Sequence, residues 1–223
     1  KAIIYHKVGN TVINSTDNII ISAVLGVYIT GLYANYSMII GIVTSFALII
    51  FAACSASIGN LNASESFKKV FGIFKLMTFL SYWIYGFCSI CFITLFQPFI
   101  ELWIGSQFKI DEMTLIFIII AFFLKGIIGI SATFLDVTKL FIITRFVPWV
   151  MAIINIIVSI ALAKTIGLSG IFVGTIISYV TTEFWINPYV LCKYKFEVPF
   201  YKYIGFTSIY LAVALIGGGI TYF

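Results

Sequence analysis

The stretch MTLIFIIIAFFL (residues 113–124) contains one polar side chain, that of Thr114. Extended to residue 136, it reaches the length of about 20 residues that a helix needs to cross a bilayer. Strands of a transmembrane barrel would be shorter and would alternate apolar with polar residues. In lipid, a spanning segment has to satisfy its own backbone hydrogen bonds, so this stretch predicts a membrane-spanning α-helix.

The composition of the whole chain agrees with that prediction. Of its 223 residues, 62% are hydrophobic and 9% are charged, and the mean hydropathy is +1.14. Soluble domains carry about 25% charged residues, and so few charges cannot cover a surface that faces water. The sequence therefore predicts an all-α polytopic membrane protein. The net charge of +5 does not indicate a nucleic-acid partner, because no basic run is interleaved with aromatic residues.

Six further segments resemble the first in length and apolar character. The seven expected spans are approximately 3–26, 32–57, 70–96, 113–136, 147–164, 170–190 and 203–223. Residues 97–112 are too polar to span, and Pro98 and Trp103 predict an interfacial turn there. The chain starts without Met and stops inside an apolar run, so we expect it to be part of a longer protein.

Positive charges alternate between the two sides of the predicted spans. One set of connections carries seven cationic residues: Lys68, Lys69, Lys139, Arg145, Lys193, Lys195 and Lys202. The other set carries only two, Lys109 and Lys164. Because cytoplasmic loops are enriched in Lys and Arg, we expect the richer side, and the start of the chain with it, to be cytoplasmic.

The first predicted span carries an unusual polar stripe. Its polar residues recur at spacings of three and four: Lys7, Asn10, Thr11, Asn14, Asp17, Asn18 and Ser22. That spacing places them on one face of a helix. A helix lying on the membrane surface would look similar, but the next residues, IIISAVLG (19–26), are apolar nearly all round and favour insertion.

A charge near the bilayer centre costs about 2.5–3.5 kcal/mol and nearly always faces a bundle interior or a wet cavity. Asp17 falls close to the middle of its predicted span. We therefore expect Asn14, Asp17 and Asn18 to line a hydrated cavity.

Lys125 is a second charge expected at the membrane centre. It lies in FFLKGIIG (122–129), about equally far from both ends of its span. One interpretation is a buried ion pair, for which Asp17 is a candidate partner, that holds helices in register. The other is a cation that lines a translocation cavity. Snorkelling to the interface is disfavoured because the ammonium would have to cross about half of the hydrocarbon.

Three further polar residues are candidates for the same cavity. Asn155 and Ser159 lie one turn apart in the fifth predicted span and could extend the polar lining or form plain interhelical hydrogen bonds. Glu183 lies about two turns from the cytoplasmic end of the sixth span, where it faces either the cavity mouth or water.

No pattern in the chain indicates an enzyme or a metal centre. The spacing CSIC (88–91) lies in an apolar helix without a nearby His, and free Cys behaves as a small hydrophobe. A glycosyltransferase or acyltransferase would need a carboxylate pair or a His-based site near an interface and loops to hold a donor. The sequence shows neither, so we expect no catalytic activity.

Several segments together are similar to one transporter family. They are GLYANY (31–36), SIGN (57–60), ELWIG (101–105), NIIVSIALAKTIGLSGIFVGTIIS (155–178) and WINPYVLCKY (185–194). These segments resemble the polysaccharide-exporter branch of the multidrug/oligosaccharidyl-lipid/polysaccharide exporter superfamily, the Wzx-type flippases. The most specific of them is the asparagine helix followed by the glycine-rich helix.

The resemblance implies a fold of two six-helix bundles around a central cavity. Residues 1–190 would form the C-terminal bundle, and 203–223 would be an additional, truncated helix. The partners implied are undecaprenyl-pyrophosphate-linked oligosaccharide, membrane lipid and the missing N-terminal lobe, in a bacterial cytoplasmic membrane. Lys125 would face pyrophosphate or acidic sugars, while Asn14, Asp17 and Asn18 would meet sugar hydroxyls or a coupling cation.

The expected function is therefore flipping of lipid-linked oligosaccharide repeat units for surface polysaccharide biosynthesis, by alternating access. No cofactor is expected apart from possible coupling to H⁺ or Na⁺ at Asp17. The alternative is a multidrug/cation antiporter of the same superfamily, in which Asp17 exchanges cation for drug. Lys125 at the cavity centre argues against cationic substrates.

Overall fold

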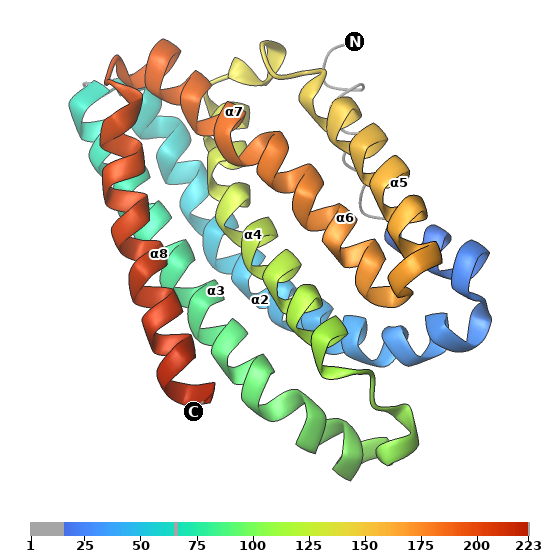
Figure 1. Ribbon diagram of the computed structural model, residues 1–223. Helices are drawn as coiled ribbons and strands as arrows, with labels where there is room; N and C mark the ends of the chain where they lie inside the picture. Colours follow the sequence, from blue (N-terminus) through green and yellow to red (C-terminus); the bar gives the residue numbers. More distant parts are fainter. Residues whose placement is uncertain (1–15, 65–66, 223) are drawn as a thin grey trace.

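The computed structural model describes residues 16–64 and 67–222, and within these ranges the chain is helical with short turns and contains no strand (Figure 1). Six helices among the described residues are long and apolar enough to cross a membrane. The protein is therefore an all-α polytopic membrane protein. The predicted first span is described only from Thr16 onward, as a short apolar helix that ends at Leu25.

The elements follow one another with few residues between them. In chain order they are η1 (Ile21–Leu25), α2 (Val27–Ser64), α3 (Phe67–Ile104), η2 (Ser106–Phe108), α4 (Glu112–Val137), η3 (Leu140–Ile142), α5 (Val147–Ile166), α6 (Leu168–Thr181), α7 (Glu183–Leu191), η4 (Cys192–Phe196) and α8 (Phe200–Tyr222). The turn between η1 and α2 falls on Gly26, whose φ of 89° suits glycine.

Two helices are much longer than the sequence predicted. Both α2 and α3 contain 38 residues. The interfacial turn predicted over 97–112 is wrong in its first half, because α3 continues through Pro98 and ends at Ile104. A proline inside a spanning helix is tolerated where neighbouring groups satisfy the freed backbone. The turn is confined to Gly105–Asp111, and the Asp111 carboxylate caps α4 by accepting from the Thr114 backbone N–H at 2.8 Å.

The two ends of the bundle differ in charge as the loop pattern predicts. The start of α3, the end of α4 and the start of α8 lie together at the top of Figure 1. The connections and adjoining helix ends here carry the seven Lys and Arg residues of the richer set, whereas Lys109 and Lys164 lie at the other end. By the positive-inside rule, we expect the richer end to face the cytoplasm.

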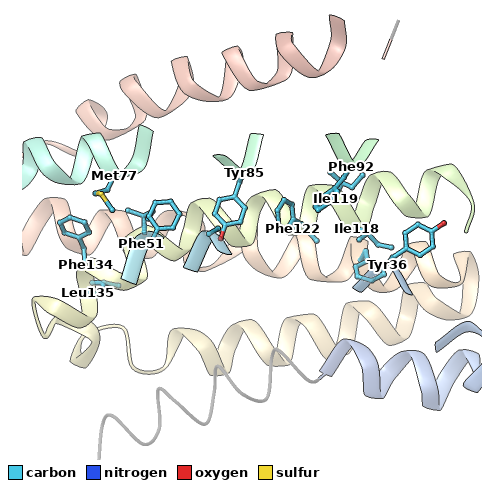
Figure 2. Packing of buried hydrophobic residues seen from close by; sticks show 14 of the residues in the cluster. Tyr36, Phe51, Met77, Tyr85, Phe92, Ile118, Ile119, Phe122, Phe134 and Leu135 are labelled. Carbon is cyan, nitrogen blue, oxygen red and sulfur yellow. The ribbon is translucent and has the colours of Figure 1, made fainter. Parts of the chain in front are cut away.

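Helix α4 lies at the centre of the bundle and contacts α2, α3, α6 and α7. Figure 2 shows the core along this helix, where Phe122 and Phe134 meet Tyr85 and Met77 of α3 and Phe51 of α2. The aromatic contacts are close, with 5.1 Å between the ring centroids of Tyr85 and Phe122. This packing holds α4 in a defined position and so positions Lys125 in its middle.

Candidate functional site

A cavity of about 500 Å³ opens on the middle of α4. Every helix from α2 to α7 contributes to its wall, including Thr44 of α2, Tyr85 of α3, Met151 of α5 and Tyr179 of α6. Its two charged side chains are Lys125 of α4 and Glu183 at the start of α7. The Lys125 side chain is exposed and that of Glu183 is half-buried.

The residue after Lys125 fixes how α4 sits against α3. Gly126 is buried, and a Cβ there would overlap the ring of Tyr85. The Ser81 hydroxyl of α3 donates to the Gly126 carbonyl at 3.1 Å. Gly126 and Tyr85 also line the cavity, so this close contact forms the part of the wall next to the Lys125 side chain.

Asp17 lies against α5 and α6 rather than in open solvent. The Thr175 hydroxyl of α6 is 3.1 Å from Asp17 Oδ1 and accepts a hydrogen bond from Asn155 Nδ2 of α5 at 3.0 Å. The Asn155 amide also interacts with the Asp17 carboxylate. Asp17 is half-buried, while Asn155 and Thr175 are buried. The Asp17 carboxylate thus links α5 and α6 through its interactions with Asn155 and Thr175.

Several hydroxyl, carbonyl and amide oxygen atoms lie between α5 and α6 next to Asp17. Both the Thr175 and Ser159 hydroxyls point at the Ile171 carbonyl, at 3.1 and 3.0 Å. The buried Asn155 Oδ1 has no hydrogen-bond partner in the described part of the chain. An unsatisfied buried acceptor costs about 1–3 kcal/mol, so a proton donor, a water or a small hard cation would be stabilised beside it.

The close approach of α5 and α6 depends on two glycines. A Cβ on Gly174 would overlap Ser159, and one on Gly170 would overlap the Leu162 backbone. Small residues at such a seam let helix backbones approach in a membrane, where no hydrophobic force drives helices together. The seam brings Asn155 and Ser159 to their partners on α6.

The charges of the Lys125 and Asp17 side chains interact. The two groups attract each other, and the phenol groups of Tyr33 and Tyr179 also lie within electrostatic range of the Asp17 carboxylate. Tyr179 in addition lines the cavity with Lys125 and Glu183. The cluster at Asp17 and the cavity at Lys125 are therefore neighbours across α4 and α6.

The structure brings some of the predicted residues together and separates others. Asp17 and Asn155 meet at one site, Lys125 lies within electrostatic range of Asp17, and Glu183 shares the cavity with Lys125. Asn18 is exposed and is not among the residues that line this cavity. Asn14 lies outside the described residues. Asn155 and Ser159 both form interhelical hydrogen bonds to α6.

Sequence reasoning missed Thr175 and Tyr179. They lie eight and four residues before Glu183, respectively, so Thr175, Tyr179 and Glu183 follow one helical face through the α6–α7 break at Thr182. The signal in the sequence is a side chain with a polar group at every fourth position, 175, 179 and 183. The glycines of the same segment predict close backbone packing equally well.

Comparison with known proteins found no relative for this chain. No protein-family model, no curated protein and no solved structure matches it. The interpretation of the site consequently rests on its own chemistry. That chemistry combines a cation, two carboxylates, amide and hydroxyl groups, and a cavity of about 500 Å³ at the middle of α4.

Proposed function

We propose that this protein forms one lobe of a flippase that moves a lipid-linked oligosaccharide across a bacterial cytoplasmic membrane by alternating access. One observation carries the proposal: Lys125, in the middle of α4, lines a cavity of about 500 Å³ beside the hydrogen-bonded Asp17 cluster. A charge at this depth is expensive, and such residues mark substrate or ion pathways.

The physical problem that such a protein solves is desolvation. A charged sugar headgroup cannot leave water for about 30 Å of hydrocarbon unless other polar groups replace its hydration. Lys125 supplies a positive charge for phosphate, and Thr44 and Thr133 supply hydroxyls on the cavity wall. The lipid tail of the substrate stays in the bilayer while two lobes rock about the headgroup.

The partners of Asp17 make an exchange at Lys125 possible. When no substrate is bound, Lys125 and Asp17 attract each other. When phosphate takes Lys125, Asp17 keeps its hydrogen bond from Thr175 and its interaction with Asn155. A carboxylate that loses one partner but keeps two others avoids the full penalty of an unpaired buried charge.

The same cluster is suited to a coupling ion. Asp17 Oδ1, the orphaned Asn155 Oδ1 and the Thr175 hydroxyl come from three different helices. Oxygen ligands of this kind fit Na⁺, and the carboxylate alone fits H⁺. Binding of either ion at Asp17 would weaken its attraction for Lys125 and so release Lys125 to the substrate.

A second candidate function is a drug or cation antiporter, and the carboxylate of Glu183 in the same cavity favours it. A cationic drug would pair with Glu183 and be repelled by Lys125. Deletion of the gene would then make cells more sensitive to cationic dyes and leave the surface polysaccharide intact, whereas a flippase gives the opposite pair of results.

The experiment that tests the proposed function is replacement of Lys125. We expect Lys125→Ala to reduce the amount of surface polysaccharide at least about tenfold, because the removed attraction for phosphate is worth about 1.4 kcal/mol or more at an effective dielectric constant of about 20. Immunoblotting checks that the protein level is normal, and Lys125→Arg, which keeps the charge, should retain export.

The matched control is Lys164→Ala, which removes a lysine from the α5–α6 end of the bundle, away from the cavity. It should leave the polysaccharide unchanged. Normal surface polymer in cells that carry Lys125→Ala at wild-type protein level would contradict the proposed role.

A further inference from the structure

A second charged feature lies outside the cavity, where three segments meet at the cytoplasmic end. The start of α3 packs against η4, with ring centroids of Phe71 and Phe196 5.3 Å apart. It also packs against α8, with Phe71 and Phe206 6.3 Å apart. The three segments therefore present one continuous surface.

That surface is strongly basic. Residues 67–75 and 192–206 contain six lysines, which we call the basic rim: Lys68, Lys69, Lys75, Lys193, Lys195 and Lys202. Only one carboxylate, Glu197, belongs to the same two ranges. Lys195 is half-buried and the other five are exposed. Orientation in a membrane needs a bias in charge, but it does not need six lysines gathered from three helix ends.

Aromatic rings hold several of these lysines in place. The Lys195 ammonium lies 5.0 Å from the Phe67 ring, and that of Lys75 lies 5.6 Å from the Phe206 ring. The Lys193 ammonium is 5.2 Å from the ring of Tyr194. Exposed Tyr and Lys together are typical of the headgroup level of a bilayer, so the basic rim lies where lipid phosphates lie.

An apolar groove leads from the basic rim toward the membrane centre. One turn beyond Lys75 and Phe206, the rings of Phe79 and Tyr210 meet at 5.3 Å. These two residues begin a groove of about 240 Å³ along the seam of α3 and α8, which continues past Trp83 to Gly86 and Gly217. The α3–α8 seam is narrow at that point, since a Cβ on Gly86 would come within 3.5 Å of Ala214.

We propose that the basic rim and this groove form a binding site for an anionic phospholipid of the inner leaflet, with its phosphate on the lysines and one acyl chain along the α3–α8 seam. An acidic soluble protein could meet the lysines but would not occupy a groove inside the hydrocarbon. A zwitterionic lipid would fill the groove but would gain little from the lysines. Basic pockets between helices on the cytoplasmic side are known to suit acidic headgroups. The inference does not depend on the proposed transport function.

Tryptophan fluorescence in the intact protein provides a local test. Two single-tryptophan proteins would retain either Trp83, which lies in the groove and is 66% exposed, or Trp103 at the far end of α3. Each is titrated, in detergent micelles, with phosphatidylglycerol or phosphatidylcholine whose acyl chains carry bromine, a contact quencher. Circular dichroism checks that each protein is folded.

We expect phosphatidylglycerol to quench Trp83 at concentrations at least about tenfold lower than phosphatidylcholine, since each lysine near a membrane surface contributes about fivefold in affinity. The variant Lys75→Gln/Lys193→Gln/Lys195→Gln should lose this preference. The control variant Lys109→Gln/Lys164→Gln, at the opposite end, should keep it.

Three results would overturn the site. Equal quenching of Trp83 by the two lipids would show that the lysines do not select the headgroup. The same preference at Trp103 would show a general effect of charge. Absence of quenching at Trp83 by either lipid would show that another protein segment covers the groove.

Discussion

At the residue scale, the Thr175 hydroxyl is the group on which the Asp17 cluster depends. It accepts from Asn155 Nδ2 at 3.0 Å and can donate to Asp17 Oδ1 at 3.1 Å. It is buried, so no water replaces it readily if it is lost. Both partners would then lose a hydrogen bond at once. The Asn155 amide and the attraction of Lys125 would be left to compensate the Asp17 charge.

We therefore expect Thr175→Val, which keeps the shape of the side chain, to lower the free energy of unfolding by about 1–3 kcal/mol. A thermal denaturation series in detergent measures this effect, and dependence of transport on H⁺ or Na⁺ should weaken in parallel. Thr133→Val is the matched control, because the Thr133 hydroxyl lines the cavity but bonds only to the Gly129 carbonyl of its own helix. Equal stability of the two variants would refute the role assigned to Thr175.

At the element scale, the α5–α6 pair acts as a support for the site. Its two helices are joined by one residue, Gly167, whose positive φ of 62° permits the sharp reversal. Gly170 and Gly174 then keep the backbones close for two turns. The support places Asn155 and Ser159 of one helix opposite Thr175 and Ile171 of the other.

Gly174→Ala should separate these helices. The added Cβ overlaps Ser159, and relief of that overlap moves α6 away from the Asn155–Thr175 hydrogen bond. We expect a loss of about 1–3 kcal/mol of stability, as for other overpacked cores, together with weaker transport. The control Gly72→Ala adds the same atom on α3 where no other atom lies within 4 Å, and it should be neutral or slightly stabilising. Thermal denaturation compares the pair directly, and a neutral Gly174→Ala would argue against a close-packed seam.

At the scale of the whole molecule, the two faces of α4 have different surroundings. Lys125 faces the cavity that α2, α5, α6 and α7 help to build. Ile120, less than two turns away, lines an apolar groove of about 370 Å³ formed with α3 and α8. One face of a single helix is therefore expected to meet water and the other to meet lipid.

This difference predicts a difference in chemical accessibility. In a protein whose four native cysteines have been replaced, Lys125→Cys should react with a membrane-impermeant maleimide from at least one compartment. Ile120→Cys at similar depth should react at least about tenfold more slowly, because a thiolate forms poorly in hydrocarbon. Labelling of sealed membrane vesicles of both orientations measures the two rates. A Lys125→Cys protein that is unreactive from both sides would contradict the hydrated cavity.

The amino-acid pattern alone was enough for the membrane class, the helical fold and the unequal distribution of positive charge between the two ends of the bundle. These properties follow from apolar length and charge counts, which are local and independent of how helices pack. Asp17 and Lys125 stood out for the same local reason, since a charge inside an apolar run is visible without any neighbour. The ends of α2 and α3 were misjudged, because polar residues and Pro98 do not stop a helix that its neighbours support.

Packing was needed to bring the site together. Asp17 and Thr175 are 158 positions apart in the chain, and no local pattern pairs them. Their contact depends on the close packing of α5 against α6. The position of Lys125 depends on the contact between the Tyr85 ring and the backbone of the neighbouring Gly126. The sequence pattern shows which polar groups are unfavourable to bury. Only the arrangement of the helices determines which of those groups lie close enough to compensate one another by hydrogen bonds and opposite charge.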